Sequence, residues 1–341
     1  MLTQAQLSDL KERLRTPKKI LIISHRNPDG DAVGSSIALG QILNQMGHQT
    51  EVMMPNDFPK FLKFMPHSKT VFNAEFNSQG AEIKIKNAEI IFLLDFNTID
   101  RIEPLGPAVK KAKAFKILID HHQQPDDFDF VYSDTEMPAT CEMIYHLAEQ
   151  MGWAPYIDAD AATCLYTGLL TDTGNFRFPS VRASTLEVAA QLVRKGALPY
   201  KIQDEIFDTA TEARLKLLSH FLGNMRLFPE FKTALFTLSR EELLSNGFQK
   251  GDTDAFVNYG LSLKGYVFSV FMADDTQKDF VKISFRSKSD FDVSELARTH
   301  FEGGGHINAA GGRSELGIEE TVKKFIDLLP HYAEKLKNTQ P

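Results

Sequence analysis

Aspartate and histidine side chains gather at four places where an apolar stretch of the sequence ends. The four places are the run 25–31 (HRNPDGD), Asp95, the triplet Asp120-His121-His122 and Asp172. Taken singly, an aspartate in such a place is commonly a helix cap or a turn former. Four such places in one chain favour a shared site instead.

Metal binding is the chemistry that such a group of side chains could perform. Aspartates held together repel one another, and some would stay protonated unless cations lay among them. Two divalent ions would balance four carboxylates, and neutral imidazoles would fill the remaining ligand positions. Oxygen ligands with some nitrogen suit Mn²⁺ or Mg²⁺ better than a thiolate-bound zinc ion. Because a metal pair can activate a water and polarise a phosphoryl oxygen, the residue types predict a dinuclear hydrolytic site.

A parallel sheet would bring the four places together. The apolar runs 18–24, 89–95 and 115–120 end in polar residues, as buried parallel strands do, and 51–54 is a further candidate strand. Helical patterns follow at 32–46, 103–113, 139–151 and 158–170, although Pro107 weakens the start of the second. This alternation predicts right-handed crossovers and a sheet covered on both faces. The carboxyl ends of its strands line one edge, where ligands bind.

The pattern changes after about residue 198. Helical patterns at 200–208 and 211–227 predict a connection, and the segments 232–239, 265–274 and 279–287 have the apolar or alternating character of strands. Helices are expected near 292–299 and 318–329. We therefore predict a smaller α+β domain in this part of the chain.

A second candidate site lies in this later part, where glycines are dense at 303–305 and again at 311–312. Exposed amides of a glycine loop can cradle an anion, especially at a helix start, and His306 could donate a hydrogen bond to it. Arg286 and Ser287, at the end of the strand predicted at 279–287, would add donors. The alternative is a tight turn with close backbone packing.

Length and composition limit the class of protein. The 341 residues exceed the usual size of one compact domain, and 43% hydrophobic residues are enough for a sizeable core. A net charge of −7 argues against coating long nucleic acid by charge alone. Two cysteines cannot form a disulfide framework, which fits a reducing compartment. The apolar runs are too short to span a bilayer, and the first residues lack a signal sequence. We expect a cytoplasmic protein without membrane contact.

These motifs resemble the DHH phosphoesterase family. The resemblance rests on SHRNPDGDAVGS (24–35), LLDFNTIDRI (93–102), IDHHQQPDDF (119–128), GLLTDTGNF (168–176), FRSKSDFDV (285–293) and GGGHINAAGG (303–312). The motifs follow the family's order and cover almost the whole chain. They look most like the branch with a DHH-associated C-terminal domain, whose stand-alone members are nanoRNases that also dephosphorylate 3′-phosphoadenosine-5′-phosphate. Gln123-Gln124, after the triplet, depart from the polar residues that relatives often carry.

The resemblance implies a role for each matching residue. One metal ion would be held by His25 and Asp29, the other by Asp31, His121 and Asp172, with Asp95 bridging them. Asp120 would orient the ligand histidines, His122 would face the phosphate, and Arg101 would lie near the substrate. The substrate-binding residues would be Arg286, Ser287, Gly304, Gly305 and His306.

The resemblance also implies a fold and an activity. We expect a parallel-sheet α/β DHH phosphoesterase domain (1–198), a helical connection (199–227) and a DHH-associated α+β domain (228–341), with the active site in the cleft between the domains. The cofactors would be two divalent ions, Mn²⁺ in preference to Mg²⁺. The substrates and binding partners would be short oligoribonucleotides and 3′-phosphoadenosine-5′-phosphate, the latter converted to AMP and phosphate; a homodimer stays open.

Four alternatives remain. A phosphodiesterase for cyclic dinucleotides or pApA would use identical site chemistry, and a silent nucleotide-binding module would share the fold without turnover. A manganese pyrophosphatase shares the first-domain motifs but not the GGGH segment. A RecJ-like exonuclease would need further nucleic-acid-binding modules.

Overall fold

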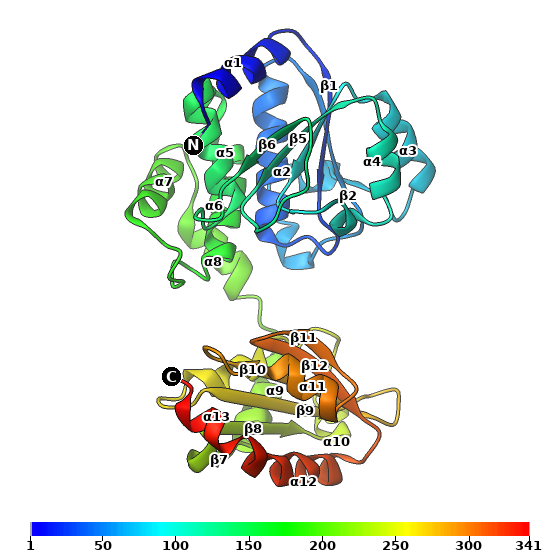
Figure 1. Ribbon diagram of the computed structural model, residues 1–341, viewed down its shortest axis with the longest axis vertical. Helices are drawn as coiled ribbons and strands as arrows, with labels where there is room; N and C mark the ends of the chain where they lie inside the picture. Colours follow the sequence, from blue (N-terminus) through cyan, green and yellow to red (C-terminus); the bar gives the residue numbers. More distant parts are fainter. Residues whose placement is uncertain (1, 341) are drawn as a thin grey trace. The chain divides into compact units, whose positions relative to one another are not determined.

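The computed structural model describes residues 2–340 and divides into two compact units, one reaching to Thr209 and the other beginning at Ala210 (Figure 1). Helix α8 (Pro199–Phe207) belongs to the first unit and α9 (Glu212–Gly223) to the second. The segment 199–227, predicted as a connection, is therefore shared between the units.

The first unit is built on a six-stranded sheet in which every pair of neighbouring strands is parallel. Its strands, in the order in which they lie side by side, are β3 (Phe72–Asn73), β2 (Gln49–Met54), β1 (Lys19–Ser24), β4 (Ile90–Leu94), β5 (Phe115–Asp120) and β6 (Phe130–Ser133). The order reverses between β1 and β4. In open parallel sheets, such a reversal is where ligands bind at the carboxyl ends of the strands.

Helices cover both faces of this sheet. Alternate side chains of β1 point to opposite faces, so Ile20 and Ile22 enter one core and Leu21 and Ile23 the other. The first core is covered by α1 (Gln4–Arg13), α2 (Gly30–Gln45), α5 (Thr140–Met151), α6 (Ala159–Asp172), α7 (Ala183–Arg194) and α8. The second core is covered by α3 (Ser78–Asn87) and α4 (Gly106–Lys111), on the other side of the sheet in Figure 1. The predicted parallel α/β architecture is confirmed.

The second unit is a six-stranded mixed sheet with helices on both faces. Its strands, in spatial order, are β11 (Gly304–His306), β12 (Ala309–Ser314), β10 (Val281–Ser287), β9 (Phe268–Asp274), β8 (Thr233–Leu238) and β7 (Arg226–Phe228). Only β8 and β9 pair in parallel; the other pairs are antiparallel. One face packs against α11 (Val293–His300), α12 (Ile318–Leu328) and α13 (Ala333–Asn338), the other against α9 and α10 (Arg240–Ser245). This is the α+β domain that the sequence predicts.

Three local predictions need correction. The helix predicted at 103–113 is shorter, because α4 begins at Gly106 with Pro107 in its first turn, where a missing N–H costs nothing. The helix predicted at 211–227 ends at Gly223, and Leu227 lies in β7.

The third correction concerns the glycine run, which forms an antiparallel β11–β12 hairpin and not a loop before a helix. A Cβ atom on Gly303 would lie 2.6 Å from the Cα of Gly312, and one on Gly305 would lie 2.8 Å from the Cα of Ala310. The glycines therefore allow two backbone segments to approach closely.

No helix within residues 2–340 is both long enough and apolar enough to cross a membrane.

Candidate metal centre

Three neighbouring strands end at the same edge of the first sheet and carry the first part of the centre. His25 directly follows β1, Asp95 directly follows β4, and Asp120 is the last residue of β5. The end of β1 is tied to β4 by the Ser24 hydroxyl, which donates to the carbonyl of Leu94 at 2.7 Å. The adjacent strand ends thus place these side chains together.

Two helices supply the remaining aspartates. Asp29 is the N-cap of α2, where its carboxylate accepts from the amides of Asp31 and Ala32 at 3.1 Å. Asp31 lies in the first turn of the same helix, and Asp172 is the last residue of α6. Helices α2 and α6 pack against each other, which brings Asp172 to the start of α2.

The side chains form two adjacent groups, and within each group the ligand atoms lie within 4.8 Å of one another. The groups are His25 with Asp29 and Asp95, and Asp31 with His121 and Asp172. The Oδ2 atom of Asp95 lies 3.6 Å from Nε2 of His25, and its Oδ1 atom lies 3.4 Å from Nε2 of His121. One carboxylate therefore faces an imidazole from each group, which is the arrangement that a bridging ligand requires.

The two histidines are oriented by backbone carbonyls. The Nδ1 atom of His25 lies 2.9 Å from the carbonyl of Arg26, and Nδ1 of His121 lies 3.1 Å from the carbonyl of Met137. A carbonyl can only accept, so Nδ1 carries the proton in each neutral imidazole and Nε2 offers its lone pair. Both Nε2 atoms point at the carboxylates, as metal-ligating imidazoles would.

Asp120 contacts a different histidine from the ones that the resemblance implies. Its side chain is completely buried, and its Oδ1 atom accepts from Nδ1 of His122 at 2.7 Å. Its Oδ2 atom has no hydrogen-bond partner among the described residues. Asp120 therefore orients His122, whereas Met137 orients His121. His122 itself lies with Asp95 and His121 in a third close group.

Without cations, the carboxylates of the centre repel one another, and this is visible in their pKa values. Burial, reinforced by the charges of Asp95 and Asp172, raises the pKa of Asp31 well above its usual range. Burial together with Asp95 and Asp29 raises the pKa of Asp172 to about 7. Burial also acts to raise the pKa of Asp95, but hydrogen bonds from His121 and His25 outweigh it and lower that pKa. A carboxylate-rich pocket of this kind suits divalent cations.

Two residues of the centre carry no signal in the sequence. Thr140 and Cys141, at the start of α5, donate their backbone amides to Asp31, and the Thr140 hydroxyl donates to Asp95. Two of the three contacts come from backbone amides, which no residue type reports, and all three depend on the tertiary packing of α5.

The remaining predicted residues differ in what they contact. Arg101 lies in the short 3-10 helix Ile99–Ile102 with an exposed side chain, and its carbonyl accepts from the amide of Arg26 at 2.8 Å. Arg286 is half-buried and lines a cavity of about 460 Å³ in the second unit. The Ser287 hydroxyl is buried; it donates to the carbonyl of Phe291 at 2.6 Å and accepts from Asn308 at 2.9 Å. Gly304, Gly305 and His306 form β11, where the His306 side chain is exposed.

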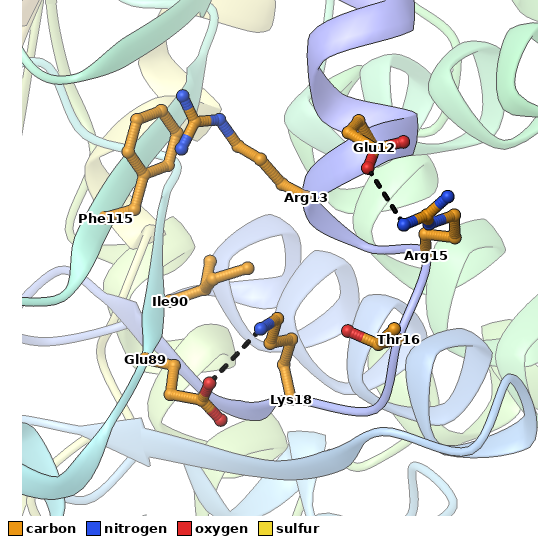
Figure 2. Close-up of a pocket in the computed structure, with 8 residues that line it drawn as sticks. All are labelled: Glu12, Arg13, Arg15, Thr16, Lys18, Glu89, Ile90 and Phe115. Carbon is orange, nitrogen blue, oxygen red and sulfur yellow. Dashed lines mark hydrogen bonds and ion pairs between the residues drawn. The ribbon is translucent and has the colours of Figure 1, made fainter.

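A different pocket lies at the opposite edge of the first sheet, where β1, β4 and β5 begin (Figure 2). It contains several cations, but each one has a partner. Arg15 lies 3.3 Å from Glu12, and Lys18 lies 3.3 Å from Glu89. The Arg13 guanidinium lies 3.6 Å from the centre of the Phe115 ring and pairs with Asp9. These mutual pairs leave little unbalanced charge for a ligand.

Family models match most of the chain. Residues 19–169 match the N-terminal domain of the DHH family, and residues 235–335 match the DHHA1 domain. The chain belongs to the DHH family, as its motifs predict.

Individual proteins are also similar to this chain over most of its length. The chain is 31% identical over 312 residues to the bifunctional oligoribonuclease and PAP phosphatase NrnA of Thermus thermophilus, covering 90% of this chain and 88% of that protein. It is 27% identical over 300 residues to the protein of the same name from Bacillus subtilis, covering 86% and 88% of the two chains. The crystal structure of an exopolyphosphatase-related protein from Bacteroides fragilis superposes with a TM-score of 0.89 and 37% identity, covering 98% of each chain.

Proposed function

We propose that this protein is a divalent-metal-dependent phosphoesterase that hydrolyses short oligoribonucleotides and converts 3′-phosphoadenosine-5′-phosphate to AMP and phosphate. The observation that carries the proposal is the pair of histidine–aspartate groups that meet at Asp95, whose carboxylate lies 3.6 Å from His25 of one group and 3.4 Å from His121 of the other. Two relatives at 31% and 27% identity are named for these two activities. The ligands would be His25, Asp29, Asp31, Asp95, His121 and Asp172.

The chemistry needs both the metal ions and the surrounding side chains. A pair of divalent ions, when bound, supplies an activated water and a Lewis acid for a phosphoryl oxygen. In its doubly protonated form, His122 would donate from Nε2 to the phosphate or to the departing oxygen, while Asp120 accepts from its Nδ1. The exposed guanidinium of Arg101 would bind a non-reacting phosphate oxygen.

Mn²⁺ is the metal ion that we propose. Each of the two groups contains one imidazole nitrogen among carboxylate oxygens. Mg²⁺ favours oxygen ligands and keeps several waters, whereas Mn²⁺ accepts imidazole more readily. Titration of the metal-free protein with each ion would test this choice, and tighter binding of Mg²⁺ would contradict it.

The second unit would bind the substrate. Arg286 supports this role because its guanidinium donates only to the carbonyl of Phe285 and makes no ion pair within residues 2–340. Its charge is therefore available to an anion. Gly304, Gly305 and His306 would contribute donors beside it. Ser287 is the weakest member of the set, since its hydroxyl already has two partners.

Measurements of KM and of metal content would distinguish a substrate-binding role of the second unit from a metal-binding role of the first. Arg286→Ala and His306→Ala should raise KM while leaving the metal content unchanged. His121→Ala should lose metal. Loss of metal in His306→Ala would show that the hairpin belongs to the metal centre and would contradict the assignment.

Product analysis tests the activity itself. The purified protein with Mn²⁺ should degrade short members of an RNA length ladder and release phosphate from 3′-phosphoadenosine-5′-phosphate. Hydrolysis of pApA alone would favour the cyclic-dinucleotide branch, pyrophosphate cleavage would favour a pyrophosphatase, and binding without products would indicate a silent module. A cytoplasmic location and a homodimer stay predictions.

Substrate length gives an independent test. The net charge of −7 argues against binding of long RNA through many phosphates, which a basic surface would require. Excess unlabelled long RNA should therefore inhibit hydrolysis of a labelled dinucleotide only weakly at physiological salt. Strong inhibition would favour a processive exonuclease.

A further inference from the structure

The first turn of α5 contacts one carboxylate from each group of the metal centre. The Thr140 hydroxyl donates to Oδ1 of Asp95 at 3.0 Å. The Thr140 amide donates to Oδ2 of Asp31 at 2.5 Å, and the Cys141 amide donates to Oδ1 of Asp31 at 2.9 Å. Thr140 is completely buried, so water does not compete for these bonds.

Asp31 acts as the cap of this helix. The residue at the N-cap of α5 is Ala139, which has no side-chain acceptor for the free amides of the first turn. The Asp31 carboxylate takes that place from 109 residues away in the chain. Each of its oxygens accepts one amide, so the plane of the carboxylate is fixed and one lone pair on each oxygen stays free.

Asp95 depends on Thr140 in a different way. Its φ of 65° lies in the left-handed region, which is uncommon for a residue other than glycine and costs conformational energy. Its amide donates to the carbonyl of Ile119 at 3.0 Å, which holds the backbone. At the side chain, the Thr140 hydroxyl makes the shortest contact, at 3.0 Å, whereas the two imidazoles lie 3.4 Å and 3.6 Å away. The hydroxyl therefore makes the closest of the contacts that fix the rotation of the carboxylate, and of these three it is the one from a group that is not itself a proposed metal ligand.

We propose that Thr140 is a positioning residue of the metal centre, which holds the bridging carboxylate of Asp95 so that its two oxygens face different metal ions. This inference rests on the proposed dinuclear site. Thr140 contacts Asp95 through its side chain and Asp31 through its backbone amide. A change of side chain therefore removes the bond to Asp95 and leaves the bond to Asp31. Loss of an outer hydrogen bond to a metal ligand typically weakens metal binding about 10- to 100-fold.

A graded series at one position tests the proposal in the full-length, metal-free protein. Thr140→Val keeps the shape and removes the donor, Thr140→Cys keeps a weak donor, and Thr140→Ser keeps the hydroxyl. The matched control is Thr185→Val, which removes an equally buried hydroxyl in α7, where its contact is the amide of Arg182. Calorimetric titration with Mn²⁺ gives the affinity of each binding step, and thermal unfolding without metal gives the stability of the fold.

We expect Thr140→Val to weaken one Mn²⁺ binding step about 10- to 100-fold, with Thr140→Cys intermediate and both Thr140→Ser and Thr185→Val close to the parent protein. Parent-like affinities in Thr140→Val would overturn the inference. If Thr140→Val does not fold, equal affinities of the serine and cysteine variants would overturn it instead. Failure of the parent protein to bind Mn²⁺ would reject the proposed metal centre, which is a different outcome.

Discussion

The two edges of the parallel sheet in the first unit carry charged side chains in opposite arrangements. At the amino edge, the cations and carboxylates pair with one another, and the Arg15 and Glu12 side chains are 72% and 68% exposed. At the carboxyl edge, Asp31 and Asp95 are 0% and 2% exposed, and carboxylates outnumber the available cations. Exposed pairs contribute little to stability, whereas buried carboxylates without cations are costly. Pairing and burial, more than the number of charges, thus distinguish the carboxyl edge, where the metal centre is proposed, from the amino edge.

The largest effect is expected when the shared carboxylate loses its charge. Asp95→Asn should reduce turnover by about 100-fold or more, because an amide cannot bridge two cations as a carboxylate does. Circular dichroism should show an unchanged fold. Glu89→Gln, at the amino edge, is the matched control and should keep full activity. Near-normal turnover in Asp95→Asn would remove the distinction between the edges.

Metal binding should also depend on pH in a defined direction. In the metal-free protein, the pKa of Asp172 is raised to about 7. Burial acts to lower the pKa of His121, but its bond to Asp95 and the charges of Asp31, Asp95 and Asp172 raise it to about 10. Both protons must leave when a metal ion binds. The affinity for Mn²⁺ should therefore rise from pH 6 to pH 8, by about tenfold or more per unit below pH 7.

Calorimetry in two buffers with different ionisation enthalpies would count the protons released. Release of at least one proton per bound ion is expected near neutral pH. An affinity that does not change between pH 6 and pH 8 would contradict the assignment of Asp172 and His121 as ligands.

A smaller effect concerns stability without metal. Asp172 has a raised pKa when folded, so the folded state holds its proton more tightly and loses stability as pH rises from about 4 to about 7. The stabilising contribution of protonated His121 is complete below about pH 6.5 and is lost as pH approaches 10. Thermal unfolding of the metal-free protein should therefore occur at a lower temperature at pH 8 than at pH 6. Added Mn²⁺ should reverse this difference, and an increase in stability with pH would contradict it.

The smallest effect is expected at the amino edge. Lys18→Ala and Arg15→Ala each remove one member of an exposed ion pair. The free energy of unfolding should change by about 0.5 kcal/mol or less, and turnover should not change. Denaturant titration and steady-state kinetics would measure both. A loss of turnover would show that the pocket in Figure 2 takes part in function.

The sequence predicts the carboxyl edge well because position and residue type coincide there. The strands β1, β4 and β5 are short apolar runs that end directly before His25, Asp95 and His121, and parallel pairing leaves one place for these ends to meet. Elements with a weak hydrophobic pattern are not predicted from the sequence. The strand β6 has four residues, and α3 contains Gly80 in its first turn.

Other features depend on packing that no local pattern reports. Thr140 follows Ala139, which gives no capping signal, and its contacts are with Asp95, directly after β4, and with Asp31 in α2. The glycine run at 303–305 indicates an unusual backbone, but glycine density does not distinguish a ligand loop from a close-packed hairpin. Nor does the position of Ser287 at the end of β10 reveal that its hydroxyl bonds with the carbonyl of Phe291 and the amide of Asn308.

The capping of α5 by Asp31 has a consequence for the order of folding. Asp31 and Thr140 are 109 residues apart, with the five strands β2 to β6 between them in the chain. Contacts of such long sequence separation form slowly, because loop closure must be completed before they contribute. The aspartates of a partly folded chain are therefore dispersed, and the site exists only once the sheet and both helices have assembled. Metal ions would then bind at the end of folding and would stabilise only those molecules whose first unit has folded completely.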